Sequence, residues 1–341
     1  MTFQSLQMKF LNTMGARSSF LRLALVTLSI FLLFSVLNPG VFLSGANFQF
    51  IFLSTPELAL LALAISVTML TAGIDLSVVG ISNVSAIAAA QLMVIMGGTN
   101  QSVPVAMLVA VAVGAVCGLV NAALIALLDV PPILATLGTQ QLFSGIALVL
   151  SGGSIIKGMP EAFTNIALIT VAGIPLIFII MLAIAALVGI LVSKSSLGFQ
   201  MRMVGSNPKA SDYSGINRIK VLTFTYLTSG VLAGIAGLII SSRASGANSQ
   251  YGVTYILLAI VVAVLAGVDP EGGYVTVSGV IIAVLALQML STGLLSIQNS
   301  PHVVNIMQGA LLIFIVALNA WGYKLSAWIK ALLGGVKAHS S

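Results

Sequence analysis

Residues 193–220 read S-K-S-S-L-G-F-Q-M-R-M-V-G-S-N-P-K-A-S-D-Y-S-G-I-N-R-I-K, and they differ from the apolar runs that make up most of the chain. The 341 residues are 59% hydrophobic and only 6% charged, yet residues 194–220 contain five of the thirteen lysines and arginines. A segment this polar does not lie in the hydrocarbon of a bilayer. Residues 194–220 are therefore expected to form a water-exposed loop, here called the wet loop, between two membrane-spanning parts.

The wet loop also carries the pattern of a short helix. Gly205 and the turn Ser206-Asn207-Pro208 precede a helix-forming run from Lys209 to Ser214. Gly215 is placed to end that run, because glycine adopts the left-handed conformation that often follows a helix. A short exposed helix between two spans is expected to dock on a partner protein.

Composition defines the class of protein. A mean hydropathy of +1.17 excludes a soluble globular domain, so the chain is predicted to be an all-α polytopic membrane protein in a lipid bilayer. The net charge of +6 does not indicate nucleic-acid binding, because the basic residues cluster beside apolar runs, where they set membrane orientation. Cys117 has no second cysteine to pair with and is expected to be a small packing residue.

Ten transmembrane helices are expected. Basic residues precede the first apolar run, residues 23–37, which lacks a nearby cleavage site, so we expect an uncleaved first helix and a cytoplasmic N-terminus. The other expected helices are residues 57–70, 76–96, 103–128, 134–150, 166–192, 221–240, 253–268, 274–295 and 303–321. An even number of crossings then returns the wet loop to the cytoplasm and leaves Lys157 outside. Runs 57–70 and 253–268 are shorter than the roughly 20 residues of a full span, so either can be broken or re-entrant.

These helices give the expected division of the chain. Residues 1–22 form a cytoplasmic segment, residues 23–321 form the transmembrane domain that contains the wet loop, and residues 322–341 form a cytoplasmic tail.

Asp75 is the most informative single residue of the apolar part. A carboxylate at membrane depth is costly and is normally paired, capping or functional. Asp75 stands just before the run 76–96 and is expected to cap that helix, whereas a proton-relay or ion site would need charged partners. The segment Ala72-Gly73-Ile74-Asp75 is similar to Ala266-Gly267-Val268-Asp269, and an internal repeat and chance explain this equally well.

Three motifs in sequence order carry a resemblance to a known family. They are Gly73-Ile74-Asp75-Leu76-Ser77-Val78 with Gly80, then Ala135-Thr136-Leu137-Gly138-Thr139, then Gly205-Ser206-Asn207-Pro208 with Ala210 and Gly215-Ile216. Over about residues 50–320 the chain resembles the permease subunits of bacterial ABC importers for monosaccharides, of the ribose, arabinose, xylose and galactose type.

The resemblance implies a type II importer fold in the bacterial inner membrane. It implies a separate ABC ATPase subunit, a periplasmic sugar-binding protein and a second permease subunit, identical or related. Within the wet loop it implies a coupling helix for the ATPase, with coupling residues Gly205, Asn207, Pro208, Lys209, Ala210, Asp212 and Gly215.

This chain also departs from the family pattern. Ala72 stands where the family has a glycine, Val79 is an extra residue, and Asp269 and Glu271 add carboxylates to a glycine-rich segment. Residues 158–163 are similar to the related permeases for the furanose signal autoinducer-2. The sugar, or autoinducer-2 in its place, is therefore left open, as are the roles of Asp269 and Glu271.

Uncharged polar residues within the apolar runs suit a pathway for a neutral polyol. The candidates are Asn83, Asn121, Thr136, Thr139, Gln140 and Gln288. For any one of them, hydrogen bonding between helices is the simpler explanation.

The chain lacks the sequence motifs of several other functional classes. The chain has no G-x-x-x-x-G-K-[S/T] phosphate-binding loop, so ATP hydrolysis is expected in another subunit. It has no histidine and cysteine spacing for a metal and no set of catalytic residues, so we expect a transporter without cofactor rather than an enzyme. An ion-coupled secondary transporter is the rival, but Asp75 is the one intramembrane carboxylate expected to suit that role.

Overall fold

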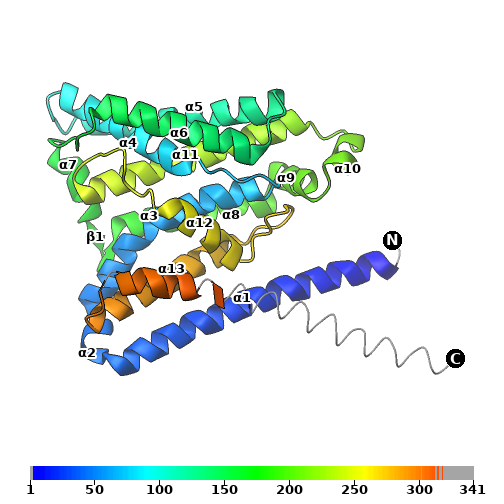
Figure 1. Ribbon diagram of the computed structural model, residues 1–341, viewed down its shortest axis with the longest axis horizontal. Coiled ribbons are helices and arrows are strands. Elements are labelled where there is room, and N and C mark those ends of the chain that lie inside the picture. Colours follow the sequence, from blue (N-terminus) through cyan, green and yellow to red (C-terminus); the bar gives the residue numbers. More distant parts are fainter. Residues whose placement is uncertain (1–2, 301, 312, 315–316, 318–341) are drawn as a thin grey trace.

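The computed structural model describes residues 3–300, 302–311, 313, 314 and 317 as a bundle of roughly aligned helices (Figure 1). Eight helices of this described part are long and apolar enough to cross a membrane. They lie in α1 (Phe3–Leu37), α3 (Gly45–Met69), α4 (Val78–Ile95), α5 (Ser102–Ala122) with the π-helix η1 (Ala123–Leu127), α6 (Pro132–Ser151), α8 (Leu176–Lys194), α11 (Arg218–Ala244) and α13 (Val277–Ser296). The prediction of an all-α polytopic membrane protein is confirmed.

Short elements connect these spans. They are α2 (Pro39–Phe42), α7 (Glu161–Thr164), the 3-10 helix η2 (Asn165–Ala167), β1 (Thr170–Val171), β2 (Ile174–Pro175), α9 (Ser196–Ser206), α10 (Pro208–Tyr213) and α12 (Tyr255–Leu265). The strands β1 and β2 pair antiparallel as a small hairpin. This hairpin occupies residues expected to begin the helix 166–192, because Ala172 and Gly173 both take positive φ values, of 51° and 82°, and turn the chain there.

The two expected helices that were shorter than a full span, 57–70 and 253–268, have different lengths in the structure. The segment expected at 57–70 belongs to α3, which starts at Gly45 because the Ser44 hydroxyl accepts a hydrogen bond from the Asn47 amide at 3.2 Å. The segment expected at 253–268 is α12, whose 11 residues cover roughly 16 Å at 1.5 Å per residue. Since a bilayer core is about 30 Å thick, α12 is the broken span. Residues 302–311, 313, 314 and 317 are helical, which agrees with the expected tenth helix, 303–321, as far as it is described. The end of that run and the tail 322–341 lie outside the described residues.

The ends of the bundle carry different elements. Figure 1 shows the start of α1 together with α9 and α10 at one end, and α2, α7 and β1 at the other end. The segment with Lys157 connects α6 to α7 and therefore lies near the second end. The wet loop and the start of α1 thus share one end, as an even number of crossings requires.

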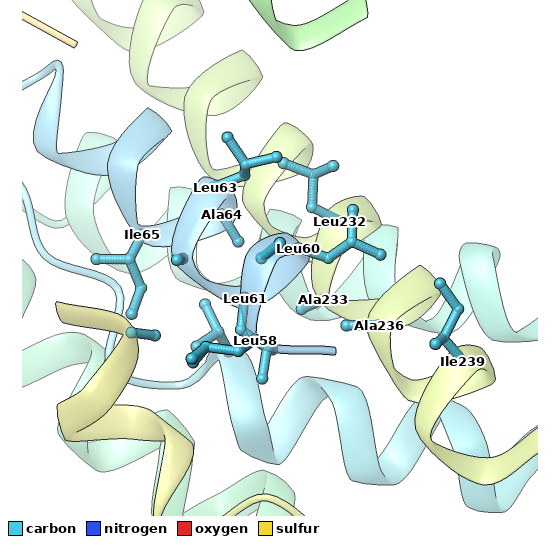
Figure 2. Packing of buried hydrophobic residues seen from close by; sticks show 14 of the residues in the cluster. Leu58, Leu60, Leu61, Leu63, Ala64, Ile65, Leu232, Ala233, Ala236 and Ile239 are labelled. Atoms are coloured by element: carbon cyan, nitrogen blue, oxygen red, sulfur yellow. The ribbon is translucent and has the colours of Figure 1, made fainter. Parts of the chain in front are cut away.

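Helix α3 lies at the centre of the core. Every side chain from Ser54 to Met69 is buried, and α3 packs on α11, α12, α13 and α8. Figure 2 shows leucines of α3, including Leu60 and Leu63, against Leu232 of α11. Most side chains of this stretch are apolar, and the hydroxyls of Thr55 and Ser66 donate to carbonyls of their own helix at 2.7 and 2.6 Å, so α3 can be buried on all sides.

Glycines bring α5 and α11 into backbone contact. A Cβ atom added to Gly118 would overlap the carbonyl oxygen of Tyr226, and one added to Gly230 would lie 2.9 Å from the Gly118 nitrogen. A Cβ atom on Gly114 would lie 3.1 Å from the Gly234 Cα. Small residues permit this approach, and in lipid such packing is a main source of helix association.

We expect Gly118→Leu to lower the yield of folded protein several-fold, because its side chain has no space between α5 and α11. The matched control is Gly145→Leu on α6, where nothing lies within 4 Å of an added Cβ. Size-exclusion chromatography of detergent-solubilised protein measures both yields. Equal monodisperse yields for the two variants would show that this helix contact does not limit folding.

Candidate functional site

The chain between α3 and α4 is not helical, and this break carries Asp75. Helix α3 ends with the Gly73 amide donating to the Thr68 carbonyl at 3.1 Å, while Ala72 adopts a positive φ of 59°. The Thr68 hydroxyl then accepts a hydrogen bond from the Asp75 amide at 3.2 Å. These contacts turn the chain inward, so that the Asp75 side chain is completely buried.

The Asp75 carboxylate joins three elements of the bundle. Its Oδ1 accepts hydrogen bonds from the Ser77 amide at 3.0 Å and the Ser77 hydroxyl at 2.6 Å. Its Oδ2 accepts from the Ser229 hydroxyl of α11 at 2.8 Å. The Asn121 amide of α5 lies 3.4 Å from Oδ1. The described residues thus supply neutral donors, and these offset the cost of burying the carboxylate.

The expectation that Asp75 caps α4 stays a prediction, and the structure adds a second set of contacts to the same carboxylate. The N-cap residue of α4 is Ser77, and it makes no capping hydrogen bond through its side chain. Asp75 bonds the Ser77 amide just before the helix and uses its other oxygen on Ser229. Asp75 is therefore also a joint between helices, because its two oxygens bond residues at the start of α4 and in α11.

Two of the expected pathway residues extend this network. The Asn121 amide donates to the Ser77 hydroxyl at 2.7 Å, and the Thr139 hydroxyl of α6 donates to the Asn121 oxygen at 2.6 Å. A continuous series of hydrogen bonds therefore runs from Thr139 through Asn121 and Ser77 to Asp75. We call these residues, with Ser229, the Asp75 network.

The other expected pathway residues divide into two groups. Thr136 donates to the Ile74 carbonyl at 3.0 Å, and Gln140 accepts from the Gly80 amide at 2.8 Å, so both lie beside the Asp75 network. Asn83 and Gln288 lie elsewhere: Asn83 donates to the Ser249 carbonyl at 2.9 Å, and Gln288 donates to the Ser54 carbonyl at 3.4 Å. The structure therefore places four of the six candidate pathway residues in or beside the Asp75 network.

Two further candidates, Ser229 and the pair of Glu57 with Arg243, were not identified from the sequence. The neighbouring sequence does not distinguish Ser229 from the other serines of the chain, except that Ser229 precedes Gly230, one of the glycines of α11 that contact α5. Glu57 is a second buried carboxylate, and its Oε1 forms an ion pair with Nη1 of Arg243 at 2.8 Å. This corrects the expectation that Asp75 is the one intramembrane carboxylate of interest.

The expected short helix of the wet loop is confirmed as α10. The Asn207 side chain accepts from the Ala210 amide at 3.0 Å and caps the helix, and Gly215 follows it with a φ of 75°. Of the expected coupling residues, Gly205 is buried, whereas Asn207, Pro208, Lys209, Ala210, Asp212 and Gly215 are exposed. The sequence interpretation passed over Tyr213, whose ring is 94% exposed at the end of α10.

Gly205 fixes α9 against the ends of two other elements. A Cβ atom at Gly205 would overlap the Leu70 carbonyl oxygen and lie 2.8 Å from the Gly273 nitrogen. The Gly273 amide in turn donates to the Leu70 carbonyl at 3.0 Å. The end of α9 is thus wedged against the α3–α4 break and the loop between α12 and α13, and we call this contact the Gly205 wedge.

A cavity of about 230 Å³ lies beside the Gly205 wedge. Thr71 and Ala72 of the α3–α4 break line it, together with Pro132 at the start of α6, Pro208 of α10 and Tyr226 of α11. This space lies between Pro208 of α10 and the α5–α6 connection.

The two similar segments of the sequence have similar local structure. Asp269 accepts a hydrogen bond from the Glu271 amide at 3.0 Å, as Asp75 does from the Ser77 amide. Both turns follow the end of a helix, but Asp269 is exposed and Asp75 is buried. The backbones also differ at the matched positions, because Ala72 has a positive φ of 59° whereas Ala266 has a φ of −65°. The structure therefore does not decide between an internal repeat and chance.

We expect Asp75→Asn to fold and to keep most of the transport activity, because the Ser229 hydroxyl can accept from the new amide as readily as it donates to the carboxylate. Asp75→Leu should lower the yield of folded protein, since it leaves several buried donors without partners. Yield and uptake in cells measure the two effects. Loss of uptake by Asp75→Asn at normal yield would instead indicate that the charge itself is required.

The comparisons with known proteins agree with this architecture. Residues 47–316 match the family model described as branched-chain amino acid transport system / permease component. The autoinducer 2 import system permease protein LsrD of Photorhabdus temperata is 30% identical over 323 residues, which are 90% of this chain and 94% of that protein. The galactose/methyl galactoside import permease protein MglC of Salmonella typhimurium is 32% identical over 313 residues, which are 87% of this chain and 93% of that protein.

The LsrD protein of Escherichia coli K12 is 32% identical over 292 residues, which are 83% of this chain and 86% of that protein. No solved structure matches the chain. The family match covers most of the chain, and the relatives match over nearly their whole length. The chain therefore belongs to the family of permease components of the branched-chain amino acid transport type, and it is a membrane transport permease rather than an enzyme.

Proposed function

We propose that this permease is the membrane subunit of an ATP-driven ABC importer that moves a monosaccharide or a similar small neutral polyol. The observation that carries the proposal is the Gly205 wedge, because it links the exposed helix α10 to the buried break that holds Asp75. A force applied to α10 from outside the bundle therefore reaches its polar interior directly.

The nature of the substrate is argued from the relatives and from the chemistry of the interior. One relative imports galactose and methyl galactoside, and others import autoinducer 2. The residues around the Asp75 network offer hydroxyl and amide groups, which can replace the hydration of a polyol. A sugar is our first candidate, and autoinducer-2 is the alternative, since the same groups suit both.

The partners follow from this mode of transport. We infer an ABC ATPase subunit, a periplasmic binding protein that delivers the substrate, and a second permease subunit that is identical or related. We place the chain in the bacterial inner membrane with α9, α10 and the start of α1 on the cytoplasmic side. The basic residues of the wet loop support this orientation, because such residues favour the cytoplasmic face.

Helix α10 is suited to dock in a groove of the ATPase. Ser211 is buried against the bundle, while Ala210 and Tyr213 face outward. An exposed aromatic ring is a common anchor of an interface, and a small residue beside it permits close approach. Closure of the ATPases on binding ATP would press on α10, move the Gly205 wedge and shift both loops that contact it, so that the permease alternates its access.

We expect Ala210→Glu to weaken ATPase binding and to lower uptake by tenfold or more, since a loss of about 1.4 kcal/mol in binding corresponds to a factor of ten. The cost arises because the contact would bury an unpaired carboxylate. Co-purification with the ATPase and uptake of labelled monosaccharides or autoinducer-2 measure the two effects. The protein itself should insert normally, because α10 lies outside the apolar spans.

Ser196→Glu is the matched control, since it adds the same charge at an exposed site at the start of α9. The experiment also tests the orientation, because the ATPase is cytoplasmic and reaches α10 only if that end of the bundle faces the cytoplasm. Undiminished co-purification and uptake with Ala210→Glu would mean that α10 is only a solvated connection.

A further inference from the structure

An ion pair in the interior of the bundle lies at a place that the proposed function does not use. Glu57 follows Pro56 within α3, and its Oε1 lies 2.8 Å from Nη1 of Arg243, in the last turn of α11. Its Oε2 accepts a hydrogen bond from the hydroxyl of Tyr255, the first residue of α12, at 3.2 Å. The Arg243 guanidinium also lies 6.0 Å from the centre of the Phe50 ring. Three helices therefore meet at one carboxylate.

Polar contacts to backbone groups hold the loop next to this ion pair. Residues 245–254, here called the connecting loop, join α11 to α12. The Ala247 and Ile156 backbones exchange hydrogen bonds of 3.1 and 2.9 Å, and the Ser249 carbonyl accepts from Asn83. Backbone groups at membrane depth need such partners, because lipid offers none. The connecting loop is thus fixed by a few directional contacts that can be broken and remade.

Stability alone does not explain the ion pair. An apolar pair of similar volume in a core is often as stable as a buried salt bridge, or more stable, because the charges lose their hydration. The side chain of Glu57 is 7% exposed, whereas that of Arg243 is 28% exposed. Because Arg243 is the more exposed of the two, the pair could separate if α12 moved away from Glu57. Charged groups within spans commonly mark a functional position.

Helix α12 connects this ion pair to the Gly205 wedge. Its first residue, Tyr255, bonds Glu57, and the loop after its last turn contains Gly273, which bonds Leu70 beside Gly205. Helix α12 has 11 residues, and Gly273 follows its last residue, Leu265, by eight residues of loop. A shift at the Gly205 wedge would reach Tyr255 through this loop and α12.

We propose that Glu57, Arg243 and Tyr255 form a latch that holds the connecting loop closed over the outer end of the bundle, and that movement of α10 releases this latch to admit substrate. The residues of the latch are positioning residues, since they act through α12 and the connecting loop. The inference rests on the proposed function for its driving force, but the latch itself is a property of this chain.

The first test measures how accessible the connecting loop is. Ser249 is 6% exposed, so Ser249→Cys in a Cys117→Ala background should react slowly with a maleimide in detergent-purified protein. Adding Glu57→Gln should raise the labelling rate several-fold, and Arg243→Gln should do the same, because either change opens the latch. Tyr255→Phe should give a smaller rise, since it removes one hydrogen bond.

The matched control is Glu161→Gln, which neutralises an exposed acid on α7 at the same end of the bundle. It should leave the labelling rate unchanged. Unchanged labelling with Glu57→Gln at normal yield would overturn the proposal. Because labelling needs neither ATPase nor substrate, failure here is distinct from failure of the proposed importer function.

The second test separates a latch from a structural support. The double variant Glu57→Met with Arg243→Met replaces the ion pair by an apolar pair of similar size, which should fold and keep the connecting loop closed. We expect slow labelling at Ser249→Cys and a transport rate reduced at least several-fold, because an apolar pair does not separate into water as the ions do. Full transport by this variant would show that the pair is only a support. The test also holds if Glu57→Gln fails to fold.

Discussion

Contact between the wet loop and the interior of the bundle depends on one place, where α9 lies against two loops and no side chain fits. The Leu70 carbonyl and the Gly273 amide both lie against Gly205, and they are hydrogen-bonded to each other. Close-packed backbone does not compress, so a displacement of α9 must displace one or both loops. The wet loop is thereby connected mechanically to the interior of the bundle.

Membrane burial explains why the polar groups form networks. Asp75 is completely buried, but hydroxyl and amide donors from α5 and α11 satisfy its oxygens. Glu57 has a guanidinium and a phenol instead. In both places the low dielectric strengthens each hydrogen bond and penalises any unpaired group, so the helices that supply the donors are held in fixed register. Small movements of one helix are then passed on to its partners.

Local signals in the sequence predicted much of this fold. Apolar runs located the spans, and the Asn207 and Gly215 pattern located α10, because caps and turns depend on neighbouring residues. Long-range pairing could not be predicted in this way. Glu57 and Arg243 come from distant parts of the chain, and nothing in their surroundings distinguishes a buried pair from two exposed charges. Asp75 was singled out, but its role as a joint depends on Ser229, which tertiary packing alone brings near.

The most direct test of the Gly205 wedge is the substitution Gly205→Ala in the complex with the ATPase and the binding protein, reconstituted in proteoliposomes. The added Cβ would overlap the Leu70 carbonyl, so α9 must move away from the α3–α4 break. We predict a complex that assembles and hydrolyses ATP but transports several-fold less substrate per ATP than the wild type. Gly145→Ala, at an open position of α6, should leave this ratio unchanged. A wild-type ratio of transport to hydrolysis in Gly205→Ala would show that the Gly205 wedge does not couple α9 to transport.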